Sequence, residues 1–177
     1  MKILQITQLV ILSTVLAGSE SAVWSFGNLV LNAPTSNDYV TVPDADSLDL
    51  RTTFTLEAWV NLATETGADQ TIVSKRRSTN GTGYALVVHS GMLGLEMNND
   101  TGNGQGINFA VSGPAAIEPG TWYHVAGTYD GTRATVFIDG IKAAESPVQI
   151  TLLNSTLPLD YRPTISARRS STVHWPD

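Results

Sequence analysis

The most informative absence from this chain is that of cysteine. Its 177 residues include none, which excludes thiol catalysis, cysteine-ligated zinc, iron–sulfur clusters and any disulfide framework. The chain has only three histidines, and no serine stands in the Gly-x-Ser-x-Gly turn that carries a hydrolase nucleophile. A chain of this length can bury enough apolar surface to fold without a metal ion or disulfide.

Charged residues are also scarce, and most of them are acidic. They form 15% of the chain, with 10 Lys and Arg against 16 Asp and Glu, a net charge of −6 and a pI near 4.9. Neutralising phosphates requires clustered basic residues, so this composition argues against a nucleic-acid partner. In place of charges the chain carries 21 Thr and 15 Ser, which favours β-strands and extracellular domains over helix bundles.

Residues 1–19 have the order of a secretory signal peptide, with Lys2, an apolar core and then small residues. The dense apolar part is shorter than the ~20 residues needed to span a bilayer. We expect cleavage somewhere in residues 19–22; the alternative is that this segment is the first strand or helix of the fold. No later segment is apolar enough to be a transmembrane span. Residues 23–177 are therefore expected to form one secreted or extracellular domain.

The rest of the chain reads as short strands separated by Gly, Pro, Asn and Asp. Residues 54–62 alternate, with apolar side chains at even positions and polar or aromatic ones at odd positions. Strand-like runs around Asp130-Gly131 and Asp139-Gly140 predict a three-stranded meander. Gly113-Pro114 is expected to lie in the connection after a strand at residues 107–111. Without any amphipathic helical stretch, the pattern predicts an all-β sandwich or barrel.

The meander also carries a family resemblance. Residues 120–132 read Gly-Thr-Trp-Tyr-His-Val-Ala-Gly-Thr-Tyr-Asp-Gly-Thr, and residues 136–140 read Val-Phe-Ile-Asp-Gly. This resembles the laminin-G-like jelly-roll domains of the concanavalin A-like lectin/glucanase superfamily. The resemblance covers about residues 24–170, and it implies two antiparallel sheets packed as a jelly-roll β-sandwich. Earlier segments fit in the family's order, at residues 38–43, 47–50, 54–60, 72–75 and 83–86.

One part of the family pattern is missing. Such domains usually close with a strand resembling Gly-x-Ile-Asp-Glu-Val-Arg-Ile beside the N-terminal strand, whereas this sequence stops at residues 173–177 without it. We therefore expect an antiparallel jelly roll that lacks its C-terminal closing strand, with an exposed sheet edge beside residues 24–31. The same departure is expected of a fragment, of a truncated gene model or of a natural short variant, and a fragment would imply additional domains in the whole protein.

The sequence offers no pair of catalytic carboxylates. Retaining glycosidases need two carboxyl groups about 5 Å apart, and the superfamily's glucanases carry a Glu-x-Asp-x-x-Glu-like strand. Here Glu57 has Thr55 and Trp59 as neighbours on its face, and Glu96 is followed by Asn98. We therefore expect no enzymatic activity, and a glycoside hydrolase using Glu57 or Glu96 is the alternative.

The candidate ligand-binding residues are Glu57, Trp59, Asn61, Asn98 and Asn99. Sugar sites combine an aromatic face with amide and carboxylate groups, and the first three project these groups from one face of a strand. The two asparagines begin a Gly/Asn loop that adds amides. In the alternative, Trp59 packs under a neighbouring loop while its polar neighbours are merely solvated.

The candidate metal ligands are Asp44, Asp46 and Asp100, and calcium is the only cofactor considered. Ca²⁺ takes about 6–8 oxygen ligands, and the first two carboxylates follow a predicted strand. No EF-hand spacing is present, so the alternative is that these residues only form turns.

Four further features have structural explanations. Trp122 and Tyr129 stand at the ends of one strand and are expected to pack in the core and hairpin. His124 is expected to be held by hydrogen bonds within the sheet. Residues 75–77, Lys-Arg-Arg, are expected to form a solvated strand end, although they could hold acidic glycans. Glycosylation sequons begin at Asn80, Asn99 and Asn154, close to the number that chance predicts.

These features together predict a secreted, non-enzymatic module that recognises a carbohydrate or an extracellular protein surface. One alternative is a structural spacer from a larger exported protein, with no ligand of its own. The other is a glycoside hydrolase of the same superfamily.

Overall fold

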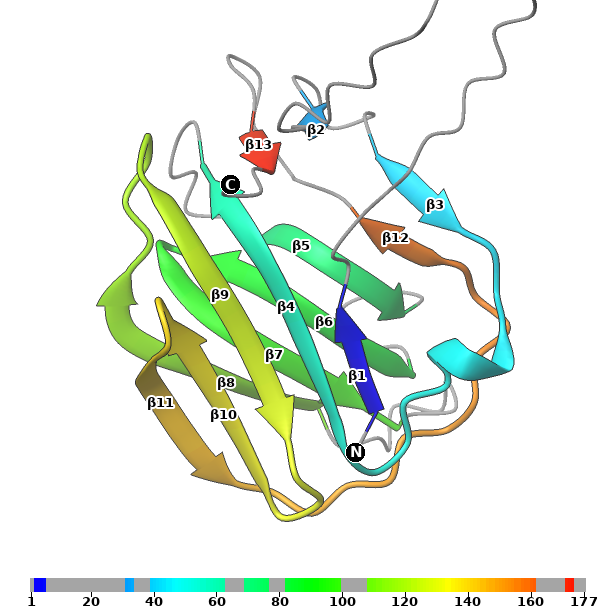
Figure 1. Cartoon of the computed structure of the whole chain (residues 1–177). Coiled ribbons are helices and arrows are strands. Elements are labelled where there is room, and N and C mark those ends of the chain that lie inside the picture. Colours follow the sequence, from blue (N-terminus) through cyan, green and yellow to red (C-terminus); the bar gives the residue numbers. More distant parts are fainter. Residues whose placement is uncertain are drawn as a thin grey trace, which may run out of the picture.

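The computed structural model describes residues 2–5, 31–33, 39–62, 69–76, 82–99, 108–161 and 171–173. Apart from one short 3-10 turn, η1 (Asp46–Leu48), every regular element in these ranges is a β-strand. The strands form two sheets that lie face to face (Figure 1). The predicted all-β, jelly-roll-like sandwich is therefore confirmed. No helix in the described ranges is long and apolar enough to cross a membrane.

The two sheets, which we call sheet A and sheet B, interleave strands from the whole chain. Sheet A has the order β11 (Ile141–Pro147), β10 (Arg133–Ile138), β9 (Trp122–Tyr129), β4 (Phe54–Asn61), β13 (Ser171–Val173) and β2 (Leu31–Ala33), and β1 (Lys2–Gln5) also pairs with β4. Sheet B has the order β3 (Val40–Val42), β12 (Leu159–Tyr161), β5 (Asp69–Arg76), β6 (Gly83–His89), β7 (Met92–Asn98) and β8 (Asn108–Ala116).

The core lies between the sheets, and β4 shows why this sequence fills it. Phe54, Leu56, Ala58 and Val60 are each at most 4% exposed, while Glu57, Trp59 and Asn61 are half-buried on the other face. Because successive residues of a strand point to opposite faces, one face of β4 meets sheet B. Fully burying a side chain such as Leu or Phe contributes about 1.5–3 kcal/mol.

Two tight turns connect consecutive strands through residues with positive φ angles. Ser90 and Gly91 have φ of 48° and 74°, and Asp139 and Gly140 have φ of 50° and 74°. Two successive positive φ angles suit the right-handed twist of the flanking strands in a two-residue hairpin. The first turn joins β6 to β7 and the second joins β10 to β11, so the predicted meander of β9, β10 and β11 is confirmed.

The prediction about Gly113-Pro114 is wrong. Instead of ending the strand, both residues lie inside β8, which continues to Ala116. β8 is the last strand of sheet B, and its register with β7 shifts between Gly94, opposite Ser112, and Met92, opposite Ala116. An edge strand with a register irregularity tolerates a proline, because the missing N–H is not needed by a neighbour.

Two short strands pair with the edge of β4 that faces away from β9 (Figure 1). β1 runs parallel to β4, from Lys2 opposite Phe54 to Gln5 opposite Glu57. Thr172 of β13 lies opposite Asn61, and β13 pairs on its other side with β2. β13 thus lies between β4 and an N-terminal strand, the position described above for the closing strand. The signal peptide and the missing closing strand remain predictions, and residues 24–30 lie outside the described ranges.

Candidate functional site

Three of the predicted ligand-binding residues lie together on the outer face of sheet A. Glu57, Trp59 and Asn61 follow one another on β4, on the face opposite the core residues Ala58 and Val60. All three are half-buried, so each presents part of its side chain to solvent. The strand therefore displays a carboxylate, an indole and an amide in a row.

Strand β9 adds aromatic side chains to this row. His124 lies directly opposite Trp59, and Trp122 lies opposite Asn61. The ring centroids of Trp59 and His124 are 5.4 Å apart with the planes tilted by 51°, which is a favourable aromatic arrangement. We call Glu57, Trp59, Asn61, Trp122 and His124 the outer-face cluster.

Within the outer-face cluster, the imidazole of His124 and the carboxylate of Glu57 lie close together. His124 Nε2 and Glu57 Oε2 are 3.7 Å apart, which is longer than a direct hydrogen bond. The backbone of His124 is fixed from the neighbouring turn, because its N–H donates to Asp139 Oδ1 at 2.9 Å and its carbonyl accepts from the Asp139 N–H at 2.8 Å. The expected role of His124, held by hydrogen bonds in the sheet, is correct for its backbone, while its imidazole faces the cluster.

The remainder of this face combines hydroxyl groups with exposed charges. Thr128 of β9 lies between Thr55 of β4 and Thr135 of β10. At the far edge, Glu145 pairs with Arg133 at 2.9 Å and with Lys142 at 3.5 Å. Exposed pairs of this kind contribute about 0–1 kcal/mol, so they shape the surface potential more than the stability.

The structure does not bring Asn98 and Asn99 to the outer-face cluster. Asn98 is the last residue of β7 in sheet B and is 2% exposed, and Asn99 follows the strand and is half-buried. Glu96 lies on the same strand, between the core residues Leu95 and Met97, and forms an ion pair with Arg76 of β5. Its carboxylate therefore projects from the outer face of sheet B, whereas the carboxylate of Glu57 projects from the outer face of sheet A.

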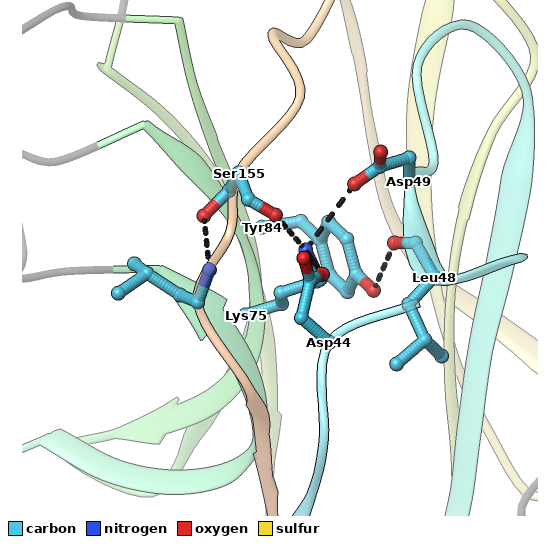
Figure 2. Close-up of polar contacts among 7 residues, drawn as sticks. Asp44, Leu48, Asp49, Lys75, Tyr84 and Ser155 are labelled. Atoms are coloured by element: carbon cyan, nitrogen blue, oxygen red, sulfur yellow. Dashed lines mark hydrogen bonds and ion pairs between the residues drawn. The ribbon is translucent and has the colours of Figure 1, made fainter. Parts of the chain in front are cut away.

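The candidate calcium ligands are not gathered into one site. Asp44 contacts Lys75, with 2.8 Å between Oδ1 and Nζ, whereas the exposed Asp46 begins η1. Asp100 lies outside the described ranges. Within those ranges, no three His, Asp or Glu side chains are placed to hold a metal ion together. Lys75 also contacts Asp49 and Ser155, and these contacts are shown in Figure 2.

Comparison with known families agrees with this architecture. A laminin G family model, described as concanavalin A-like lectin/glucanases superfamily, matches residues 34–175. The chain belongs to this superfamily. Among curated proteins there is no match to this laminin-G-like chain.

Solved structures resemble this laminin-G-like domain in fold. The binding domain of Paraclostridial Mosquitocidal Protein 1 has a TM-score of 0.63 at 16% identity, covering 83% of this chain and 38% of that one. The Botulinum neurotoxin serotype D ligand binding domain, solved with N-acetylneuraminic acid, has 0.61 at 11% identity, covering 82% and 37%. Domains LG4-5 of the mouse laminin alpha1 chain have 0.61 at 16% identity, covering 89% and 43%. The chain thus spans less than half of each of these structures.

Two members of the outer-face cluster in this laminin-G-like domain were missed as site residues. Tyr129 is in the core as expected, at 2% exposure, but Trp122 is half-buried on the opposite face. Counting along β9 would have separated them, because an even and an odd position of one strand point to opposite faces. The same count places His124 beside Trp122.

The prediction of a solvated strand end at residues 75–77 is also wrong where it can be checked. The side chains of Lys75 and Arg76 are only 1% and 8% exposed, and Arg77 lies outside the described ranges. The physical reason is that each charge has a partner: Lys75 meets two aspartates on one face of β5, and Arg76 meets Glu96 on the other.

Proposed function

We propose that this chain is an exported, non-enzymatic carbohydrate-binding module, and that it binds its ligand through the outer-face cluster. The observation that carries the proposal is the joint display of Trp59, His124, Glu57 and Asn61 on two paired strands. Export is supported by the signal-peptide-like residues 1–19.

The chemistry of the cluster suits a sugar. An indole offers an apolar face for the C–H side of a pyranose ring, while a carboxylate and an amide accept and donate hydrogen bonds to its hydroxyls. Trp59 is held in place by His124, which reduces the entropy lost on binding. The similar structures include two toxin binding domains, one of them in complex with N-acetylneuraminic acid, which supports a binding role for this fold.

We expect the preferred ligand to be an uncharged glycan. The carboxylate of Glu57 lies inside the cluster, and a second carboxylate, such as that of a sialic acid, would be repelled by it. The net charge of −6 adds to this repulsion at long range.

A glycan array probed with the purified chain, with millimolar calcium or with a chelator, tests this proposal. We expect binding to neutral oligosaccharides, with weaker signals from N-acetylneuraminic acid. Binding restricted to sialylated glycans would contradict the ligand class, and silence across the array in both conditions would favour the structural spacer.

Substitutions then locate the site by isothermal titration calorimetry with the strongest array ligand. Trp59→Ala should weaken binding about tenfold or more, because a stacking contact of about 1.4 kcal/mol is lost. Asn98→Ala, on sheet B, and Ile141→Ser, at a residue 74% exposed, should leave the affinity unchanged. Loss of binding in Asn98→Ala with retention in Trp59→Ala would move the site to sheet B.

The placement of Glu57 and Glu96 supports binding over hydrolysis. Their carboxylates project from the two opposite outer faces of a sandwich whose sheets lie about 10 Å apart. They therefore cannot form a catalytic pair of carboxyl groups separated by about 5 Å. Release of reducing sugars from a β-glucan, lost in Glu57→Gln or Glu96→Gln, would instead establish the hydrolase alternative.

A further inference from the structure

The most unusual charge in the described ranges is the ammonium group of Lys75. It lies on β5 opposite Tyr84 of β6, and its side chain is 1% exposed. Removing an ammonium group from water costs several kcal/mol, and this cost is offset only where other groups replace its hydration. The groups around Lys75 must therefore provide the hydrogen bonds and charge stabilisation that water would otherwise give its ammonium group.

Three oxygen atoms surround the Lys75 Nζ atom. Asp44 Oδ1 lies at 2.8 Å and Asp49 Oδ1 at 3.2 Å, and the carbonyl oxygen of Ser155 completes the set. Figure 2 shows all three pointing toward the amine. An ammonium group has three N–H donors, so each donor has one acceptor. We call Asp44, Asp49 and the Ser155 carbonyl the oxygen cage.

The cage is held in position by its surroundings. The Tyr84 hydroxyl donates to the Leu48 carbonyl at 2.9 Å, which fixes the turn that carries Asp49. Burial raises the pKa of Tyr84, and the carboxylates of Asp49 and then Asp44 raise it further. The phenol therefore remains a neutral donor at physiological pH. On the other side, the Leu157 N–H donates to Ser155 Oγ at 3.2 Å, which steadies the segment that supplies the carbonyl.

Two carboxylates and a carbonyl converging on one point form a cation-binding arrangement. Such oxygens are the ligands that Ca²⁺ takes in proteins, and here they meet a cation that is covalently part of the chain. With Lys75 present the three charges sum to about −1, so a second cation has little charge left to bind at this point.

We propose that the oxygen cage is a cation site whose resident ion is the Lys75 ammonium, and that a divalent ion occupies it when that ammonium is removed. Lys75 thus makes this rim of the sandwich independent of metal ions. Asp44, a candidate calcium ligand by sequence, has this internal cation as its partner instead.

The test compares two variants of the full chain. Lys75→Ser removes the charge and opens space in the cage, whereas Lys75→Met removes the charge but fills the space. We expect 10 mM CaCl₂ to raise the Tm of Lys75→Ser by roughly 3–5 °C, as a site with a Kd near 1 mM would. The wild-type chain and Lys75→Met should show no shift.

Terbium gives a spectroscopic readout of the same site. Tb³⁺ substitutes for Ca²⁺, and Tyr84 beside the cage can sensitise its luminescence. We expect sensitised emission with Lys75→Ser, its displacement by Ca²⁺, and its loss when Asp49→Asn is added. Emission from the wild-type chain that Asp44→Asn abolishes, or no calcium response of folded Lys75→Ser, would overturn the proposal.

A second comparison covers the case in which Lys75→Ser does not fold. In Lys75→Met the two carboxylates face each other without a cation, so adding Asp49→Asn should raise its Tm by relieving repulsion. In the wild-type background the same Asp49→Asn change should lower the Tm. A decrease of Tm by Asp49→Asn in both backgrounds would show that the aspartates do not act as ligands of a shared cation.

Discussion

At the scale of single residues, long-range polar partners were beyond the reach of the sequence. Lys75 is separated from Asp49 by 26 positions and from Ser155 by 80, so no local pattern could join them. The three basic residues at positions 75–77 were predicted to be exposed to solvent because buried lysines are rare. Only the strand alternation, which places Lys75 on the face of the core residue Val73, carried a contrary signal.

Asp130 is a residue whose role follows from its turn. Its Oδ1 accepts hydrogen bonds from the Thr132 N–H at 2.7 Å, the Thr132 hydroxyl at 2.9 Å and the Arg133 N–H at 2.7 Å. These bonds favour the charged carboxylate, with the Thr132 N–H contributing most, and hold the pKa of Asp130 below its usual value. Such a side chain-to-backbone turn is what an Asp-Gly pair predicts between two strands.

We therefore expect Asp130→Asn to lower the Tm in a pH-dependent way. A carboxylate with a depressed folded pKa stabilises the native state above its unfolded pKa of about 3.9 and loses this effect as the pH falls through the folded pKa. The Tm difference from wild type should be full above about pH 5 and shrink below pH 4, measured by scanning calorimetry. A difference that stays constant from pH 7 to pH 2.5 would contradict this account, and Glu118→Gln, at an exposed acid, serves as the charge control.

At the scale of elements, strands were predictable where alternation and turn residues agreed. Phe54–Asn61 and the meander from Trp122 to Pro147 satisfy both signals, and the structure has strands there. The predicted strand ended before Pro114, whereas β8 continues past it. A proline in the sequence shows that one backbone N–H is missing, but it does not show whether a neighbouring strand needs that N–H as a donor. The sequence also does not show which sheet each strand joins. Asn98 and Trp59 were therefore predicted to belong to one ligand-binding set, although they lie in different sheets.

Gly127 of β9 shows how closely the sheets approach. A Cβ added there would meet Leu86 Cδ1 at 3.0 Å and Leu95 Cδ1 at 3.2 Å, both from sheet B. We expect Gly127→Val to lower the free energy of unfolding by about 1–3 kcal/mol through overpacking, as measured by urea denaturation. Intrinsic strand propensity predicts the opposite sign, since Val is favoured in strands and Gly is not. A Gly127→Val chain as stable as wild type would mean that the sheets can move apart at no cost.

At the scale of the whole molecule, β1 pairs with β4 although residues 1–19 are predicted to be a signal peptide. Residues 2–5 cover the β4 edge from Phe54 to Glu57, and they belong to the segment predicted to be removed as a signal peptide. Parallel pairing of so short a strand within an antiparallel sheet is a weak contact. Its loss would leave strand N–H and C=O groups open to another chain.

We expect a chain that starts at residue 20 to self-associate more readily than the full chain. Size-exclusion chromatography with light scattering over a concentration series should show the difference, because an unpaired edge promotes strand-to-strand association. Thr55→Lys in the shortened chain should reduce it by placing a charge on that edge. If both lengths remain equally monomeric at high concentration, the β1 pairing does not protect this edge.

The oxygen cage also has a consequence for the lifetime of the folded state. Its ligands come from the connection around η1 and from the connection before β12, and they meet Lys75 of β5, so all three segments are distant in the chain. Bringing them together costs loop-closure entropy, and we expect these contacts to form after the folding transition state. Interactions absent from the transition state act on the unfolding rate and leave the folding rate unchanged. We therefore expect Lys75→Met to accelerate unfolding in stopped-flow denaturant jumps with little effect on refolding, so that this buried charge mainly determines how long the native fold persists.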